Sequence, residues 1–111
     1  MKLSEAISLG AMLSPQAIGR TTDDHGGRCA WASAVDAVGR EATTPNKFAQ
    51  WSWTRRHATC PECKSSGRVV DTIVHLNDTH RWSRQSIADW ISTIEPTEET
   101  SPDGGEYSSV A

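Results

Sequence analysis

The sequence lacks long apolar runs. No stretch approaches the roughly 18 consecutive apolar residues that a membrane span requires, so we expect no transmembrane helix. Near the N-terminus an acidic residue, Glu5, is present and no long apolar block follows, which argues against a secretory signal peptide. These absences argue against a membrane span and a signal peptide, and they favour a cytoplasmic chain.

Cysteine is scarce as well. Only three cysteines are present, and two of them form a Cys-x-x-Cys pair, Cys60 and Cys63. A small number with one close pair is typical of metal ligands in a reducing compartment rather than of a disulfide framework. We therefore expect thiolates that bind a metal ion.

Apolar residues are fewer than usual. They make up 36% of the 111 residues when glycine is left out. This is below the usual fraction of about 45–50%, which includes glycine, even when that difference is allowed for. A chain of this size is marginally stable without help, and a structural metal is a frequent form of help. Five tryptophans compensate in part, because each can bury a large area. We expect one domain over residues 1–95 and a disordered acidic tail over residues 96–111.

Positive charge is absent from the C-terminal quarter. Residues 85–111 hold no lysine or arginine and six acids, whereas residues 51–84 hold six basic and three acidic residues. A basic segment beside an acidic one favours an anionic partner such as nucleic acid, although an ordinary solvated surface has the same composition. The candidate partner-binding residues are Arg55, Arg56, Lys64, Arg68, Arg81 and Arg84.

The chain does contain a metal-ligand pattern. Cys60 and Cys63 are followed by His75 and His80, with the spacing C-x2-C-x11-H-x4-H. Two thiolates and two imidazoles suit a four-coordinate zinc ion, so these four residues are the predicted zinc ligands. Residues five apart differ by about 140° around a helix, so the two histidines cannot share one face of a regular helix. We expect His75 to end a strand, residues 76–79 to turn, and His80 to precede the last helix, unlike a ββα finger.

Other interpretations of these residues stay open. Cys29 could replace one histidine as the fourth ligand, although a buried small side chain is its simpler role. A Cys-Pro-x-Cys sequence also occurs in thiol–disulfide oxidoreductases, but here Gly67 and its polar neighbours break the helix that such a motif opens. If one histidine were free, an open zinc site with Asp78 as base would suit a nuclease.

The first half of the chain is predicted to be helical over residues 1–57. A helix over residues 3–13 would be capped by Ser4, and a second over residues 29–38 would end at Gly39. Its alanines would let the first helix pack closely against it. Thr44 and Pro45 then signal the start of a short third helix.

The second half is predicted to hold a zinc knuckle and a helix over residues 58–95. Residues 65–67 would turn, and the β-branched pairs within residues 69–74 favour short strands. Ser83 is the expected N-cap of the last helix. Its apolar residues Ile87, Trp90, Ile91 and Ile94 follow a helical period, and Pro96 would end it.

One stretch resembles a known group. Cys60-Pro-Glu-Cys63 with Ile73-Val-His-Leu-Asn-Asp-Thr-His80-Arg-Trp-Ser-Arg-Gln-Ser-Ile-Ala-Asp-Trp90 is similar to small bacterial and phage-encoded proteins. They share CPxC followed by HLNDxHxW[ST]RxxIAxW, and the likeness covers roughly residues 29–94. The resemblance implies a phage or prophage context and a metal site on the two cysteines and two histidines. It implies no substrate.

Together these patterns predict an α+β fold, a small and mainly helical domain with a Cys2His2-type zinc knuckle. The expected function is that of a zinc-stabilised binding or adaptor protein that contacts nucleic acid or a host or phage protein through its basic face. The alternatives are a structural virion or assembly component and a metal-dependent nuclease. No small-molecule substrate is predicted.

Overall fold

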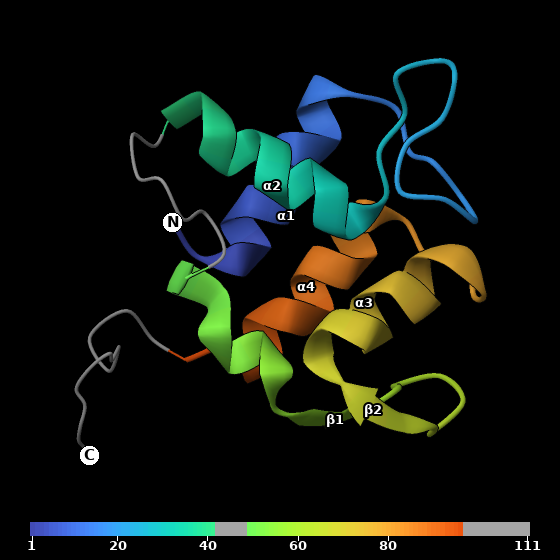
Figure 1. Ribbon diagram of the computed structural model, residues 1–111. Helices are drawn as coiled ribbons and strands as arrows, with labels where there is room; N and C mark the ends of the chain where they lie inside the picture. The colour runs from blue at the N-terminus through green and yellow to red at the C-terminus, as the bar shows by residue number, and fades with distance from the viewer. Residues whose placement is uncertain (42–48, 97–111) are drawn as a thin grey trace.

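The computed structural model describes residues 1–41 and 49–96 (Figure 1). These residues form an α+β fold that is mainly helical, as predicted. The elements are, in order, α1 (Leu3–Leu13), α2 (Ala30–Glu41), the 3-10 helix η1 (Ala49–Arg55), β1 (His57–Thr59), β2 (Ser66–Arg68), α3 (Val69–Asp78) and α4 (Arg84–Ile94). Among these described elements, no helix has both the length and the apolar character to cross a membrane.

The helices share one hydrophobic core. α1 packs against both α2 and α4, and α3 lies between this group and the two-stranded sheet (Figure 1). The largest fully buried apolar side chains come from both halves of the sequence, and removing them from water stabilises the fold. They are Leu3, Ile7, Trp51, Ile73, Leu76, Ile87 and Ile91.

α1 and α2 approach each other very closely, as the small residues of α2 predicted. A Cβ atom at Gly10 would lie 2.1 Å from the backbone oxygen of Ser33, so only glycine fits there. Ala30, Ala34 and Ala37 of α2 are fully buried. Small side chains at a helix crossing allow the backbones to touch, and dispersion contacts then replace the missing side-chain volume.

The predicted bounds of α1 are confirmed, but two end signals were wrong. Lys2 is the N-cap of α1, and Ser4 lies inside its first turn, where its hydroxyl donates to the carboxylate of Glu95 beyond α4. Gly39 does not end α2, which continues to Glu41. Thr44, Pro45 and residues 97–111, including most of the proposed tail, lie outside the described residues.

The β-branched segment is a helix rather than strands. Val69, Ile73 and Leu76 of α3 are all buried, and they recur at helical spacing. Burying this stripe outweighs the modest β-propensity of valine and isoleucine, which is about 1 kcal/mol at most. The sheet instead pairs β1 with β2 in antiparallel register, His57 opposite Arg68, so residues 66–67 are strand and not turn.

The last helix begins and ends as predicted. Ser83 is the N-cap of α4, and its Oγ accepts a hydrogen bond of 3.0 Å from the amide of Ser86. Ile87 and Ile91 are fully buried, whereas Ile94 is 41% exposed at the end of the helix. The helix stops before Pro96, so local signals set both ends of this element.

Candidate metal centre

The turn between β1 and β2 positions the two cysteines. The amide of Cys60 donates to the carbonyl of Ser65 at 2.8 Å, and the amide of Lys64 donates to the carbonyl of Cys60 at 3.0 Å. Lys64 has a φ of 68°, a left-handed conformation that lets the chain reverse in so short a loop. Cys60 is fully buried and Cys63 is exposed.

The end of α3 positions the two histidines. His75 lies in the last turn of α3, and its carbonyl accepts the amides of Thr79 at 2.8 Å and His80 at 3.3 Å. Arg81 then takes a left-handed φ of 56° and redirects the chain towards α4. His80 therefore stands just outside the helix, as its spacing required. His75 does not end a strand, so that prediction was wrong, and the order of elements around the site is strand, strand, helix.

The four predicted ligands come together. One donor atom from each of Cys60, Cys63, His75 and His80 lies within 4.8 Å of all the others. A tetrahedral shell with bonds of about 2.0–2.3 Å needs donors about 3.3–3.8 Å apart. Cys63 Sγ and His75 Nε2 already meet this spacing, at 3.3 Å. The cluster could hold a metal ion.

His80 gives the clearest sign of a missing bond. Its Nδ1 lies 2.9 Å from Oε2 of Glu62 and pairs with that carboxylate. Its Nε2 is buried without a hydrogen-bond partner, the one such side-chain nitrogen or oxygen in the described part of the chain. A lone pair left buried and unsatisfied is costly, by about 1–3 kcal/mol. A metal ion at this position would satisfy it.

Glu62 supports the site from inside the Cys-x-x-Cys motif. Besides His80, it binds the indole Nε1–H of Trp82, which donates to Oε1 at 2.6 Å. A carboxylate that holds the far nitrogen of a ligand histidine fixes the tautomer and orients the ring. The metal-ligand spacing does not predict this role of Glu62. The available signal was an acidic residue between the cysteines with an indole donor two residues after His80.

Hydrogen bonds around Cys63 favour its thiolate. Ser65 lies closest, with its Oγ 3.2 Å from Cys63 Sγ, and hydrogen bonds from Ser65 and then from His75 lower the pKa of Cys63 to about 5. The thiolate, rather than the thiol, is the form that binds metals. At neutral pH this ligand therefore needs to lose no proton when a metal ion enters.

Cys29 lies apart from the cluster. It is 3% exposed at the start of α2, and its Sγ accepts a hydrogen bond of 3.4 Å from the amide of Ala32. The group of potential ligands found in the described residues does not include it. Its surroundings match the simpler interpretation, a buried small side chain at a helix N-terminus.

Asn77 and Asp78 tie the loop before α2 to the end of α3. The carboxylate of Asp78 accepts the amide of Gly19 at 2.9 Å and the Nδ2 group of Asn77 at 2.8 Å. Asn77 is fully buried and all its polar atoms are satisfied. It binds Gln16, Ala17 and Ala30. Asp78, the base that a nuclease would need, is thus occupied in holding a loop.

The predicted basic face is only partly present. Arg55, Arg56, Lys64 and Arg81 are exposed, and none of the four forms an ion pair within residues 1–41 and 49–96. Arg68 is exposed too, but its guanidinium holds Asp71 at 2.8 Å, which neutralises part of its charge. Most of these cations lie on η1 and the hairpin.

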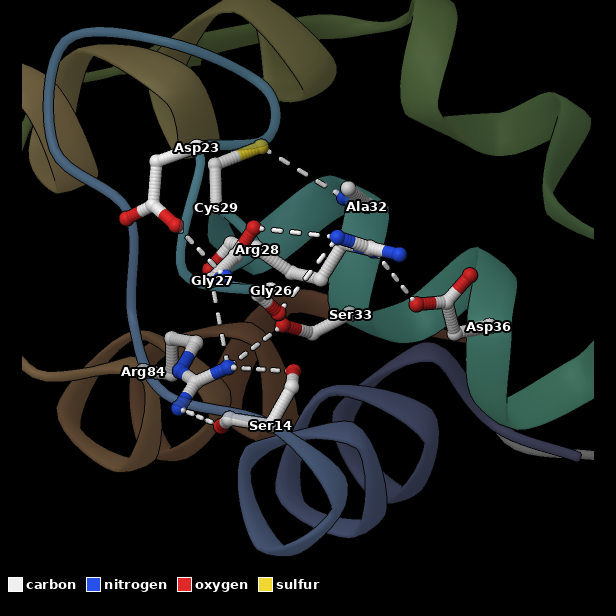
Figure 2. A network of polar contacts seen from close by, with 10 residues as sticks. All are labelled: Ser14, Asp23, Gly26, Gly27, Arg28, Cys29, Ala32, Ser33, Asp36 and Arg84. Carbon is white, nitrogen blue, oxygen red and sulfur yellow. Dashed lines mark hydrogen bonds and ion pairs between the residues drawn. The ribbon is translucent and has the colours of Figure 1, made fainter.

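Arg84 does not belong to this face, so its assignment as a partner-binding residue was wrong. It is 6% exposed and points into the contact between α1, α2 and α4 (Figure 2). Its guanidinium donates to Ser33 Oγ at 2.8 Å and to the carbonyls of Ser14 and Ala11 at the end of α1. Burial lowers the pKa of Arg84, and the negative end of the α1 dipole offsets the loss of water.

Compared with protein-family models, curated proteins and solved structures, the chain matches none.

Proposed function

We propose that this chain is a binding module whose fold is held by one structural zinc ion on Cys60, Cys63, His75 and His80. The observation that supports it best is the buried, unpartnered Nε2 of His80 beside three further donors. Two thiolates and two imidazoles form a donor set that suits zinc. Because four protein ligands complete the shell, no position remains for a reactive water.

In this proposal zinc replaces the core that a small chain lacks. The cysteines belong to the β-hairpin, His75 belongs to α3, and His80 lies on the link to α4. One ion would therefore fasten three parts of the chain to one another. Structural zinc contributes about 10–16 kcal/mol in finger peptides, comparable to the whole stability of a small domain.

The proposed partner is nucleic acid, contacted through its phosphates. Arg55 and Arg56 precede β1, and His57 stands opposite Arg68 on the exposed face of the hairpin. Exposed guanidinium groups without carboxylate partners are well suited to phosphate oxygens. The likeness to phage-encoded proteins fits a role in a phage or prophage, with a host or phage protein as the other class of partner.

The test measures zinc content and the salt dependence of binding together. Purified protein should hold one zinc ion per chain, and its affinity for DNA should fall steeply with salt. Log K falls as log[salt] rises, and each lost phosphate contact makes this slope less steep by about 0.9. The double variant Arg55→Gln, Arg56→Gln should therefore reduce the slope by about 2 while zinc content stays the same.

Arg20→Gln is the matched control, because Arg20 is exposed in the loop before α2, outside the hairpin. It should leave the slope unchanged. Binding that is insensitive to salt would point to a protein partner instead. A folded chain without zinc would contradict the structural-zinc proposal itself.

A further inference from the structure

The two cysteines of the metal centre differ sharply in accessibility. Cys63 is exposed, whereas Cys60 has no exposed surface. Cys29, the third cysteine, is only 3% exposed and lies in another part of the fold. A reagent in solution therefore meets one sulfur of the chain before the other two.

The surroundings of Cys63 leave this sulfur open to solvent. It lies within hydrogen-bond distance of Ser65 Oγ and of His75 Nε2, on the exposed side of the cluster. Thiolate character and exposure together govern the reaction of a cysteine with oxidants. Cys60 Sγ lies within 4.8 Å of Cys63 Sγ, so a second thiolate stands ready to attack the first once it is oxidised.

We propose that Cys63 is an oxidation site through which hydrogen peroxide releases the metal ion and closes a Cys60–Cys63 disulfide. This inference rests on the proposed zinc centre and adds a means of controlling it. The structural reason is the pairing of one exposed and one buried thiolate on the same ion, with the exposed one attacked first.

The reaction has two steps. The sulfur of Cys63 attacks one peroxide oxygen, the O–O bond breaks, and hydroxide leaves, which makes Cys63 a sulfenic acid. The thiolate of Cys60 then attacks that sulfur, the S–S bond forms, and the S–O bond breaks with loss of a second hydroxide. Two thiolates lose two electrons in total, and one peroxide is reduced to two hydroxide ions, which water protonates.

The consequence is loss of the ion and of the link that it makes. After disulfide formation only His75 and His80 remain as ligands, and two imidazoles hold zinc far less tightly than four ligands do. The hairpin is then no longer fastened to α3 through the ion. A thiol reductant with added zinc should restore the centre, because no sulfur has passed beyond the reversible steps.

The experiment treats zinc-loaded full-length protein with hydrogen peroxide and follows zinc release with a chromophoric indicator. In parallel, peptide mass mapping locates each oxidised cysteine. We expect one zinc ion released for each Cys60–Cys63 disulfide, and Cys63 alkylated by N-ethylmaleimide at least about tenfold faster than Cys60 or Cys29. Cys29→Ser should release zinc at the rate of the natural chain.

Three results would overturn the inference. They are zinc loss with both cysteines still reduced, first attack at Cys29 or Cys60, and retention of zinc after Cys63 has been oxidised. Zinc content is measured before peroxide is added. A value near zero at that stage contradicts the zinc centre itself, whereas one zinc per chain that peroxide does not release contradicts only the oxidation site.

Discussion

The carboxylate of Glu62 and the imidazole of His80 form a close pair, with Oε2 2.9 Å from Nδ1. The same carboxylate accepts the indole proton of Trp82 through its other oxygen. Glu62 thus connects the turn between β1 and β2 to the segment that leads into α4. This relationship makes a residue between the two cysteines responsible for the orientation of a ligand 18 positions later.

Replacing Glu62 should therefore weaken metal binding. Glu62→Ala removes the acceptor for His80 Nδ1–H, so the ring loses its fixed tautomer and orientation. Loss of such a partner lowers metal affinity about 10–100-fold. Glu62→Gln keeps one oxygen acceptor without the charge, so its zinc affinity should lie between that of the natural chain and that of Glu62→Ala. Competition with a chromophoric chelator measures each zinc dissociation constant.

Asp24→Asn is the matched control for this pair, because Asp24 is an exposed acid in the loop before α2. It should leave zinc affinity unchanged. Equal affinity in Glu62→Ala and the natural chain would show that His80 is held by other contacts, and it would remove the role assigned to Glu62.

Removing zinc should affect the whole fold rather than the hairpin alone. Ile73 and Leu76 of α3 share one core with Ile7 of α1 and Ile87 of α4. When the ion is removed, α3 loses the anchor that holds it to the hairpin, and its core residues lose their fixed positions. We expect a chelator to abolish amide protection in β1, β2, α3 and α4 and to reduce it strongly in α1. Hydrogen exchange followed by mass spectrometry measures each element.

Cys29→Ser should respond to the chelator as the natural chain does, because Cys29 lies outside the cluster. Cys60→Ser should resemble the chelated state without any chelator. Unchanged protection after complete removal of zinc would show that the apolar core is sufficient by itself, and the structural role of the ion would be lost.

Arg84 joins three helices, and its replacement should destabilise them. Arg84→Ala leaves Ser33 Oγ and the carbonyls at the end of α1 without their donor in a buried place. Unsatisfied buried groups and the lost packing together predict a decrease of about 2–4 kcal/mol in the free energy of unfolding. Arg84→Lys should recover only part of this, because an ammonium group cannot reproduce the planar fork. Urea unfolding of the zinc-loaded protein measures both.

Arg20→Ala serves as the control, since Arg20 is exposed, and its effect should stay within about 0.5 kcal/mol. If Arg84→Ala proved as stable as this control, the buried guanidinium would be dispensable for the fold. The zinc content of each variant should be one, which separates this effect from loss of the ion.

Local signals in the sequence predicted what local chemistry determines. The clustering of Cys60, Cys63, His75 and His80 followed from their spacing, and the start of α4 followed from Ser83, whose side chain caps its own helix. Long-range contacts escaped prediction. Arg84 was predicted to be a surface cation because its partners, Ser33 and Ser14, lie 51 and 70 positions away in the sequence. No period or composition connects residues so distant in sequence.

The strands were misplaced for a related reason. Propensity favoured strands at the valines and isoleucines of residues 69–74, whereas packing against the core made them helical. The true strands are three residues each: β1 is His-Ala-Thr and β2 is Ser-Gly-Arg, and of these residues only threonine has a marked β-propensity. They form because the turn over residues 60–65 brings them together. Tertiary constraints of this kind override a weak local preference.

Asp23 should make the loop before α2 sensitive to acid. Its Oδ1 accepts the amides of Gly27 at 2.7 Å and His25 at 2.9 Å, and these bonds lower the pKa of Asp23 below 3.8. Because the folded-state pKa is the lower one, the stabilisation is complete above 3.8 and declines as the pH falls through the folded value. Asp23→Asn should speed amide exchange at Gly27 and remove this acid dependence. Exchange that stays slow in the variant would contradict the role of the carboxylate.

Gly10 tests how closely α1 and α2 must approach. Gly10→Ala would place a Cβ 2.1 Å from the carbonyl oxygen of Ser33, which belongs to the backbone and cannot turn aside. Alanine favours a helix by about 1 kcal/mol over glycine, so an unhindered site would gain stability. Here the overlap forces the helices apart and disturbs Ser33, whose hydroxyl accepts a hydrogen bond from Arg84. We expect a net loss of about 1–3 kcal/mol in the free energy of unfolding, measured in urea with zinc bound.

Gly67→Ala is the control, because its nearest neighbour, Asp71 Cβ, would be 3.9 Å away, and it should change stability little. A stabilised Gly10→Ala would mean that the two helices do not touch at this point.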